Sequence, residues 1–279
     1  MRRLGDLARI AVIWLVVTVV GMVLVATVLD PHLPPGGAST EASGQRFDNE
    51  VLTLVSVPIV ALVLVYFGYV LIAFRERDPR TLRDGPPVRG HAQTQTIWVV
   101  VTSATVLFLA AFGTYELLGG AGGGQGPNPV FIPAADRTGS PLDVQVIGQQ
   151  WQFTFRYPTL GGFETAQLVL PVDRQIKLHV TSLDVVHSFW ANKLGVKADA
   201  NPGVDNIAYV TPTQVGSFRL RCAELCGLFH GYMFDTGRVV SASDFQKWAA
   251  DQKAFMAPVR KYLPAYGHHY FPDPQYRGG

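Results

Sequence analysis

Residues 221–233 read RCAELCGLFHGYM, and this stretch holds both cysteines of the chain together with a histidine, a methionine and a glutamate. Three residues separate Cys222 from Cys226, three more precede His230, and two more precede Met233. Thiolate, thioether and imidazole groups together select copper over magnesium or calcium. One cysteine would indicate a mononuclear blue-copper site, whereas two indicate a pair of copper ions bridged by two thiolates.

A disulfide is the competing interpretation of the two cysteines. In a chain with a domain outside the cytoplasm, a cysteine pair is commonly oxidised. His230 and Met233 follow so closely that they favour copper over the disulfide. The stretch then lacks one ligand, because two bridged copper ions need a second strong imidazole from elsewhere in the chain.

Three apolar runs explain why 48% of the 279 residues are hydrophobic and only 16% are charged. They cover residues 10–29, 51–74 and 97–115, and none of them contains a charged residue. About twenty residues span a bilayer as a helix, so each run is long enough. Two interpretations of residues 1–29 stay open: a signal peptide that is removed, or a first transmembrane helix that is retained.

The distribution of arginine predicts the orientation in the membrane. The segment 75–96 is rich in arginine, whereas the Pro, Gly and Ser-rich segment 30–50 holds only Arg46. The positive-inside rule therefore makes 75–96 a cytoplasmic loop and places everything after residue 118 outside. We expect an exposed external connector over 30–50 and a helical hairpin over 51–118. The net charge of +2 implies no nucleic-acid partner.

The second half of the chain has the pattern of an all-β domain. Residues 119–129, GGAGGGQGPNP, predict a flexible linker. From about residue 130, short segments with strand-like alternation are separated by Gly and Pro turn signals, which predicts a β-sandwich or barrel of the cupredoxin-like class over 130–256. We expect a helix over 243–256 capped by Ser243, and an extended tail over 257–279.

The second imidazole has to come from one of the other six histidines. His187 in SLDVVHSFW follows a predicted strand, at a strand-to-loop transition of the kind that places copper ligands, and we select it. His179 lies within the predicted strand KLHVTS, where we expect a solvent-facing structural role. The pair His268 and His269 in the tail is a minor alternative metal site.

Five motifs in this order carry a family resemblance. They are GQQWQFTFRY at 148–157, LVLP at 168–171, TSLDVVHSFW at 181–190, LGVKADANPG at 194–203 and CAELCGLFHGYM at 222–233. Together with the membrane hairpin, they resemble subunit II of haem-copper cytochrome c oxidases, the subunit that carries the binuclear CuA centre. The resemblance covers roughly residues 50–250.

The resemblance implies a full ligand set and a function. Cys222 and Cys226 would be the two bridging thiolates, and His187 and His230 would be the two terminal imidazoles. Met233 and the backbone carbonyl of Glu224 would be the two weak axial groups. The copper pair would accept electrons from cytochrome c and pass them to the haem and copper of subunit I, where oxygen is reduced to water and protons are translocated. The partners implied are subunit I, other oxidase subunits, a c-type cytochrome and the lipid of the cell membrane, which the chain crosses more than once.

Two further residues take roles from the resemblance. The side chain of Glu224 would reach a magnesium or manganese ion at the boundary with subunit I. Trp151 corresponds to the aromatic residue through which electrons arrive from cytochrome c; its alternative is a core tryptophan of a sandwich.

The chain departs from the family pattern in three places. Gln95 stands where a proton-conducting glutamate is common, and it does not titrate. Val204 stands where arginine is common. From residue 119 onward there are fourteen Lys and Arg against twelve Asp and Glu, so an acidic docking face for a basic cytochrome c has no support. A less basic cytochrome is an alternative donor, and a membrane-anchored copper carrier is the alternative function.

Overall fold

The computed structural model describes residues 2–75, 90–119 and 140–259. These residues fall in two compact units, one formed by 1–33 and 47–115 and the other by 34–46 and 116–279. Most of the predicted loop 75–96, most of the linker 119–129, and all of the tail beyond residue 259, including His268 and His269, lie outside the described residues.

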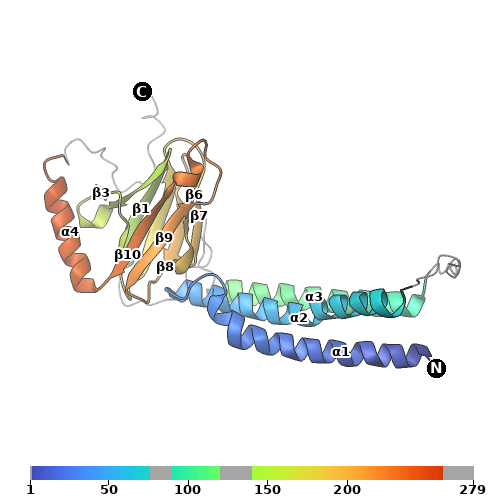
Figure 1. Ribbon diagram of the computed structural model, residues 1–279. Helices are drawn as coiled ribbons and strands as arrows, with labels where there is room; N and C mark the ends of the chain where they lie inside the picture. The colour runs from blue at the N-terminus through green and yellow to red at the C-terminus, as the bar shows by residue number, and fades with distance from the viewer. Residues whose placement is uncertain (1, 76–89, 120–139, 260–279) are drawn as a thin grey trace. The chain divides into compact units, whose positions relative to one another are not determined.

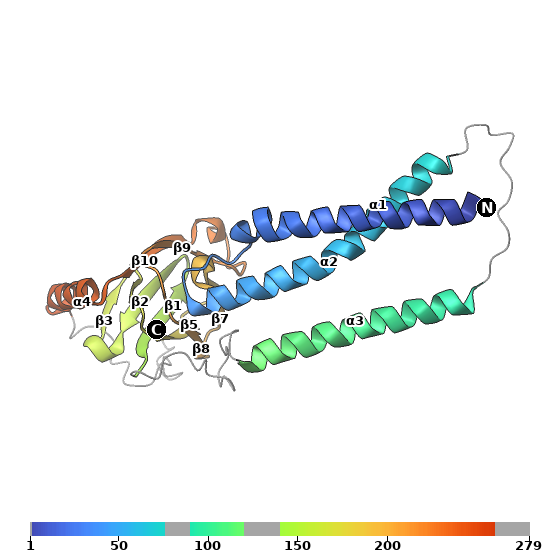
Figure 2. The ribbon, with the colours of Figure 1, turned by 90° about the horizontal axis from the view of Figure 1, so that it is seen from below.

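The first unit consists of long apolar helices. These are α1 (Arg2–Leu24), continued by the π-helical turn η1 (Val25–Leu29), then α2 (Thr40–Ala73) and α3 (Ala92–Gly119). Three helical spans in the described chain are long and apolar enough to cross a membrane, and they contain the three predicted runs almost entirely. Trp14 Nε1 of α1 donates a hydrogen bond to the Pro58 carbonyl of α2 at 2.8 Å, and the two helices cross in the view of Figure 2.

Residues 34–46 differ from the exposed connector that we expected, because they pack on the β-domain. The Thr40 amide donates to the Thr211 carbonyl at 3.1 Å, and the Thr213 amide donates to the Ala38 carbonyl at 3.0 Å. The Ser39 hydroxyl is buried and donates to the Leu194 carbonyl at 2.8 Å. The polar composition of this segment suggested an open loop, but its backbone groups form hydrogen bonds with the β-domain.

The second unit is a β-sandwich of two five-stranded sheets (Figure 1). One sheet has the order β3-β2-β1-β5-β8, and the other has the order β4-β10-β9-β6-β7. The strands are β1 (Leu142–Gln149), β2 (Gln152–Tyr157), β3 (Phe163–Thr165), β4 (Val169–Pro171), β5 (Ile176–Ser182), β6 (His187–Ala191), β7 (Val196–Ala200), β8 (Asn206–Val210), β9 (Gly216–Cys222) and β10 (Phe234–Val240). The predicted fold class is confirmed.

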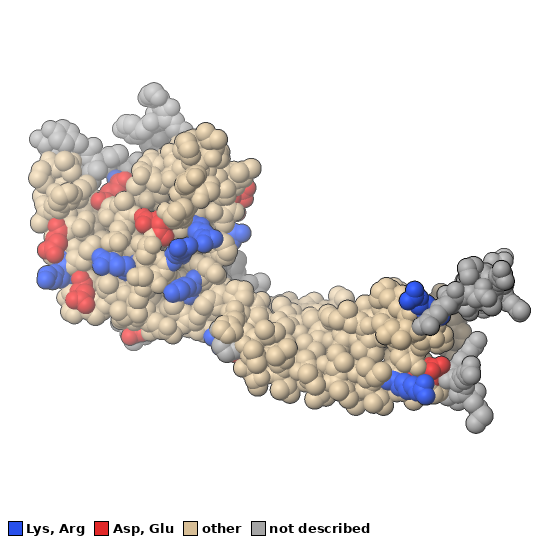
Figure 3. All heavy atoms as spheres, in the orientation of Figure 1, with Lys and Arg blue, Asp and Glu red and all other residues tan. Residues whose placement is uncertain are grey.

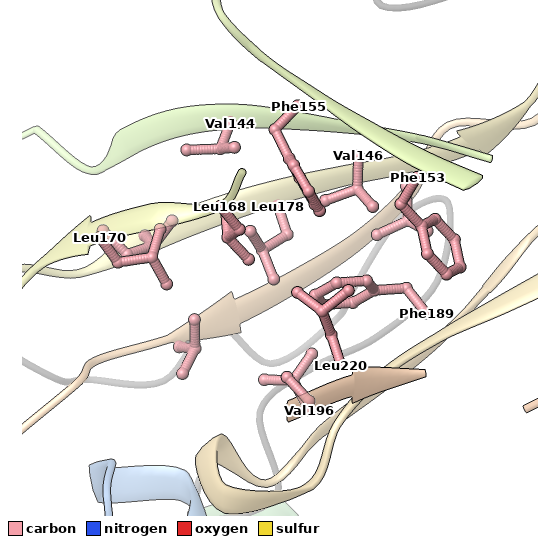
Figure 4. Close-up of a cluster of buried hydrophobic side chains, with 14 of the residues drawn as sticks. Val144, Val146, Phe153, Phe155, Leu168, Leu170, Leu178, Phe189, Val196 and Leu220 are labelled. Carbon is pink, nitrogen blue, oxygen red and sulfur yellow. The ribbon is translucent and has the colours of Figure 1, made fainter. Parts of the chain in front are cut away.

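The core forms because alternate residues of each strand face the opposite sheet. Figure 4 shows aliphatic and aromatic side chains of the two sheets facing one another, among them Phe153 and Phe155 of β2, and Phe189 of β6. The rings of Phe153 and Phe189 meet edge to face with centroids 5.7 Å apart. This packing holds β6 and β9 at the end of the sandwich where the cysteines lie.

Three strands and one helix cap were not as the sequence suggested. The sequence predicts strands within 144–146, 151–157, 167–170, 175–181, 206–211, 217–221 and 238–241, so β3, β6 and β7 were not expected. Helix α4 (Ala242–Met256) begins one residue before the predicted start, and its cap is Ser241, whose hydroxyl accepts from the Asp244 amide. Ser243 was therefore the wrong cap, although the predicted helix exists.

Candidate metal centre

Two strands of one sheet bring His187 and Cys222 together. His187 is the first residue of β6 and Cys222 is the last residue of β9. The strands are antiparallel, with Phe189 opposite Cys222. Because alternate side chains share a face, His187, Phe189 and Cys222 all point into the sandwich. His187 thus opens a strand, where we had expected a strand-to-loop transition.

The loop between β9 and β10 supplies the remaining donors. The Cys222 amide donates to the Met233 carbonyl at 2.9 Å, which closes the loop at its base. A short 3-10 helix, η6 (His230–Tyr232), turns the imidazole of His230 inward. Gly227 has a φ of +116°, and a Cβ there would lie 2.9 Å from Gln150 Nε2. A side chain at this position would therefore strain the loop and push it off the sheet.

The donor atoms form one cluster. The two sulfurs, Cys222 Sγ and Cys226 Sγ, are 3.7 Å apart, and both cysteines are free, so the disulfide interpretation is not the one the structure adopts. His187 Nδ1 lies 3.8 Å from Cys222 Sγ, and His230 Nδ1 lies 3.5 Å from Cys226 Sγ. Met233 Sδ is 3.8 Å from Cys226 Sγ. All the predicted side-chain ligands are thus brought together.

The backbone carbonyl and the carboxylate of Glu224, for which different roles were predicted, lie in different surroundings. The backbone carbonyl lies 3.2 Å from Cys222 Sγ, next to the cluster. The Glu224 side chain is exposed, and among the described residues it belongs to no group of three or more His, Cys, Asp or Glu side chains that could hold a metal ion. The carbonyl therefore belongs to the sulfur cluster, while the carboxylate is free to meet a partner.

The cluster is buried at the edge of the core. Cys226 and Met233 are 3% and 2% exposed, and His187 has no exposed surface. Burial, together with the neighbouring Cys222, raises the pKa of the Cys226 thiol. Two adjacent thiolates in an apolar site would therefore need cations to compensate their charge, and bound copper ions would supply it. His187, Cys222 and Cys226 are close enough to hold a metal ion.

Asp184 orients His187, and no sequence pattern predicted this role for Asp184. His187 Nε2 lies 2.9 Å from Asp184 Oδ1, so the ring directs Nδ1 at the sulfur atoms. Burial acts to raise the pKa of the Asp184 carboxyl, but hydrogen bonds from the Gln150 amide, His187 and the Val185 amide lower it further than burial raises it. A carboxylate that fixes a ligating histidine in this way sets its tautomer and its basicity.

Trp151 touches the centre through the backbone of Cys226. Its Nε1 donates to the Cys226 carbonyl at 3.1 Å, and Gln150 Nε2 donates to the same carbonyl at 2.8 Å. The indole meets the ring of Phe229 edge to face, with centroids 4.9 Å apart. Trp151 is half-buried, so it joins the protein surface to a residue of the sulfur cluster.

His179 is not solvent-facing, contrary to our expectation. It is 2% exposed, and its Nδ1 lies 2.7 Å from Asp205 Oδ2 while its Nε2 lies 3.4 Å from Asp143 Oδ1. Alternation in β5 does point it away from the core, but the outer face of that sheet is buried at this point. The prediction of a structural role, as opposed to copper ligation, agrees with its two carboxylate partners, Asp205 and Asp143.

The donor set fits copper. Two thiolates, two imidazoles and a thioether are soft or intermediate ligands, and such a set in an apolar pocket is typical of copper sites that transfer electrons. The arrangement can hold one or two copper ions with little movement of its ligands.

Comparison with known proteins places the chain beside a group of respiratory proteins. Residues 163–240 match the family described as cytochrome c oxidase subunit II, periplasmic domain, and this range contains His187 and the whole 221–233 stretch. Cytochrome c oxidase subunit 2 of Thermostichus vulcanus is 29% identical, over 89% of this chain and 88% of its own length. The corresponding protein of a Synechocystis species is 28% identical, over 78% of this chain and 75% of its own length.

A solved structure extends the comparison to the β-domain. The crystal structure of the periplasmic domain of subunit II of cytochrome oxidase from Bradyrhizobium japonicum is 32% identical in sequence to this chain. The match covers 45% of this chain and 99% of that domain, with a TM-score of 0.41.

Proposed function

Because this chain belongs to the family of cytochrome c oxidase subunit II proteins, we propose that its external domain holds a binuclear CuA centre that relays electrons from a c-type cytochrome to subunit I. The chain is a membrane-anchored subunit of a haem-copper terminal oxidase, with an external domain and with other oxidase subunits as partners. In the proposal, oxygen is reduced to water at the haem and copper of subunit I.

The observation that carries the proposal is the convergence of soft donors on two adjacent sulfurs. Cys222 and Cys226 would bridge the two ions, and each sulfur has one imidazole Nδ1 within 3.8 Å. The Met233 thioether and the Glu224 carbonyl lie on the flanks of the pair. When bound, the copper pair supplies a one-electron carrier whose geometry changes little between its redox states.

The protein's own residues hold and insulate this carrier. Asp184 keeps His187 in the ligating orientation, and the buried pocket excludes water from the sulfurs. Trp151 is half-buried and donates a hydrogen bond to the backbone of Cys226, which supports its role in receiving electrons. The exposed Glu224 carboxylate is proposed to reach a magnesium or manganese ion at the boundary with subunit I.

The domain limits follow from the same proposal. We assign 51–118 to the membrane hairpin, 130–256 to the copper domain, and 1–29 to a further segment that is either retained or removed. The hairpin would cross the plasma membrane, with the loop 75–96 on the cytoplasmic side and the copper domain on the periplasmic side.

Copper stoichiometry and electron-spin resonance of the purified external domain test the proposal. We expect two copper ions per domain and a seven-line mixed-valence signal. The variant Cys226→Ser removes one bridge, so we expect it to abolish the seven-line signal. One copper per wild-type domain with a four-line signal would contradict the binuclear assignment.

Trp151→Ala separates an electron relay from a copper carrier. A relay predicts a slower rate of reduction by a c-type cytochrome with unchanged copper content, whereas a carrier tolerates the change. Trp151→Phe is the matched control, because it keeps an aromatic ring and loses only the hydrogen bond to the Cys226 carbonyl. Equal reduction rates in wild type and Trp151→Ala would favour the carrier.

A further inference from the structure

The side-chain donors of the metal centre all come from one sheet and its loop, and the opposite sheet meets them through one turn. His187 begins β6 and Cys222 ends β9, and the other donors lie in the loop between β9 and β10. The turn between β1 and β2, which belong to the opposite sheet, consists of Gln150 and Trp151. A loop with few contacts opens more easily than the strands beside it, so the contacts of this turn decide how firmly the loop is held.

The Cys226 carbonyl is the point at which the turn holds the loop. In the described chain, residues 224–229 form hydrogen bonds to the opposite sheet only at this carbonyl, which accepts from Gln150 Nε2 at 2.8 Å and from Trp151 Nε1 at 3.1 Å. The Gln150 amide packs directly on the next peptide, since a Cβ at Gly227 would lie 2.9 Å from Nε2. The side chain of Gln150 thus fixes the backbone of a candidate ligand.

The backbone of Gln150 holds the histidine side of the centre. Its amide donates to Asp184 Oδ2 at 2.7 Å, while Asp184 Oδ1 lies 2.9 Å from His187 Nε2. The Leu183 amide donates to the Gly148 carbonyl at 3.0 Å, which ties the start of the same loop to β1. The two oxygens of one carboxylate therefore connect Gln150 to the imidazole.

Few charged side chains lie around this network. The three segments that form it, 148–152, 183–187 and 223–234, contain only two residues of the Lys, Arg, Asp and Glu types, Asp184 and Glu224. In the view of Figure 3, Lys and Arg side chains lie over the sheet of the β-domain, and its upper right end is mostly uncharged. Because few ionic charges are near, the dipoles of hydrogen-bonded amides contribute a larger share of the local electric field.

We infer that Gln150 is a positioning residue for the metal centre, whose side chain holds the cysteine loop while its backbone holds the pair Asp184 and His187. The inference deepens the proposed function and rests on it, because the donors that Gln150 positions are those of the proposed copper pair. Its contacts to the centre run through the Cys226 carbonyl and the Asp184 carboxylate, so it acts through other residues and is not itself a ligand. One residue of the opposite sheet thereby sets both halves of the donor set.

The hydrogen bond to Cys226 also affects the reduction potential. The positive end of the Gln150 amide dipole points at the peptide of Cys226, and this favours the reduced state of a metal ion bound to the Cys226 sulfur. Loss of this donor is therefore expected to lower the midpoint potential of the centre. A residue that only stabilised the fold would leave the potential unchanged.

The variant Gln150→Met in the intact oxidase complex tests the hold on the loop. Methionine keeps the length of the side chain and removes its N–H donors, while the backbone amide of residue 150 still reaches Asp184. Gln150 is exposed, so the change leaves the core packing intact. In the copper-depleted complex we expect the amides of residues 223–233 to exchange hydrogen about threefold to tenfold faster than in wild type, as measured by mass spectrometry, because one of the bonds that close the loop is lost.

The copper-loaded complex of the same variant gives the second measurement. We expect its copper affinity, measured by competition with a chelator, to fall about tenfold, because a group that orients a ligand is lost. We also expect a lower midpoint potential and a copper hyperfine splitting that differs from that of wild type. Redox titration and electron-spin resonance measure these two quantities.

Gln152→Met is the matched control. Gln152 is exposed at the start of β2, and its side chain forms no hydrogen bond within the described ranges. Loop exchange and copper affinity in Gln150→Met within twofold of those in Gln152→Met overturn the inference. Faster exchange with the midpoint potential and spin signal of the control also overturns it, since a merely structural role predicts that result.

The exchange measurement separates this inference from the proposed function. It uses the copper-depleted complex, so it reports the hold on the loop whatever metal wild type binds. A wild-type complex without a copper pair contradicts the proposed function, whereas unchanged exchange in Gln150→Met with the pair present contradicts only the positioning. Should Gln150→Met not assemble, Gln150→Asn takes its place with the same expected results, because its amide is one methylene group short of the Cys226 carbonyl.

Discussion

At the scale of single residues, Asp184 and His187 act as a unit. The ring of His187 is enclosed, with no exposed surface, and a Cβ added to Gly148 would lie 3.0 Å from its Cδ2. Packing against Gly148 fixes the plane of the ring, and the carboxylate of Asp184 fixes which nitrogen faces the sulfurs. The ligand is therefore oriented before a metal ion binds.

The variant Asp184→Asn tests this orientation. An amide cannot replace the negative charge that supports His187, so we expect copper affinity to fall about tenfold to a hundredfold while the domain stays folded. Competition with a copper chelator measures the affinity, and circular dichroism monitors the fold. Asp199→Asn, on an exposed strand position, is the control. An affinity within twofold of wild type would show that packing alone orients the ring.

At the scale of elements, His179 joins three parts of one sheet. It lies on β5, with Asp143 of β1 on one side and Asp205, just before β8, on the other. Burial and the charge of Lys177 lower the pKa of His179, but the hydrogen bonds to Asp143 and Asp205 and the charge of Asp205 raise it by more, to above its ordinary value of 6.5. The charged form of this histidine therefore stabilises the sheet.

The pH dependence of unfolding tests this role. Because the pKa of His179 is higher in the folded than in the unfolded protein, its stabilisation is fully present below pH 6.5 and is lost as pH rises through the folded pKa. We expect the unfolding free energy of the external domain to fall over that window, and the fall to be smaller in His179→Asn. Urea titrations at several pH values measure it. Identical pH profiles for the two proteins would refute the role.

At the scale of the whole molecule, the first helix is bound to the second. Trp14 Nε1 donates to the Pro58 carbonyl at 2.8 Å, and the Tyr69 hydroxyl donates to Asp6 Oδ1 at 2.7 Å. A Cβ on Gly21 would come within 2.9 Å of Val57 Cγ1, so the helices approach closely there. Polar hydrogen bonds between apolar helices contribute to their association in a bilayer.

The mass of the chain in the purified oxidase tests whether this helix persists. The two hydrogen bonds tie residues near the start and in the middle of α1 to α2, so we expect residues 1–29 to remain in the mature subunit. Intact-mass spectrometry of the complex, with N-terminal sequencing as the check, gives the answer. A chain that starts after residue 29 would contradict the prediction and identify this segment as a removed signal peptide.

Much of the fold could be predicted because its signals are local. The three apolar runs are continuous in the sequence, and seven of the ten strands overlap segments predicted from local residue patterns. Strands β6 and β7 were missed because HSFWA and VKADA are short, and their pairing partners stabilise them more than their own sequences indicate. The packing of residues 34–46 was missed for the same reason, since its hydrogen bonds go to residues more than 150 positions away.

The sequence by itself determined which kinds of donor groups this protein offers, and the tertiary structure decided how those groups and their partners are brought together. The spacing within 221–233 predicts five copper donors, counting the Glu224 carbonyl, because a short loop keeps them together whatever surrounds it. The placement of His187, of its partner Asp184 and of the Trp151 hydrogen bond depends on strand register. Register joins residues far apart in the chain and sends neighbours such as Arg221 and Cys222 to opposite faces, so only the folded sheet places them.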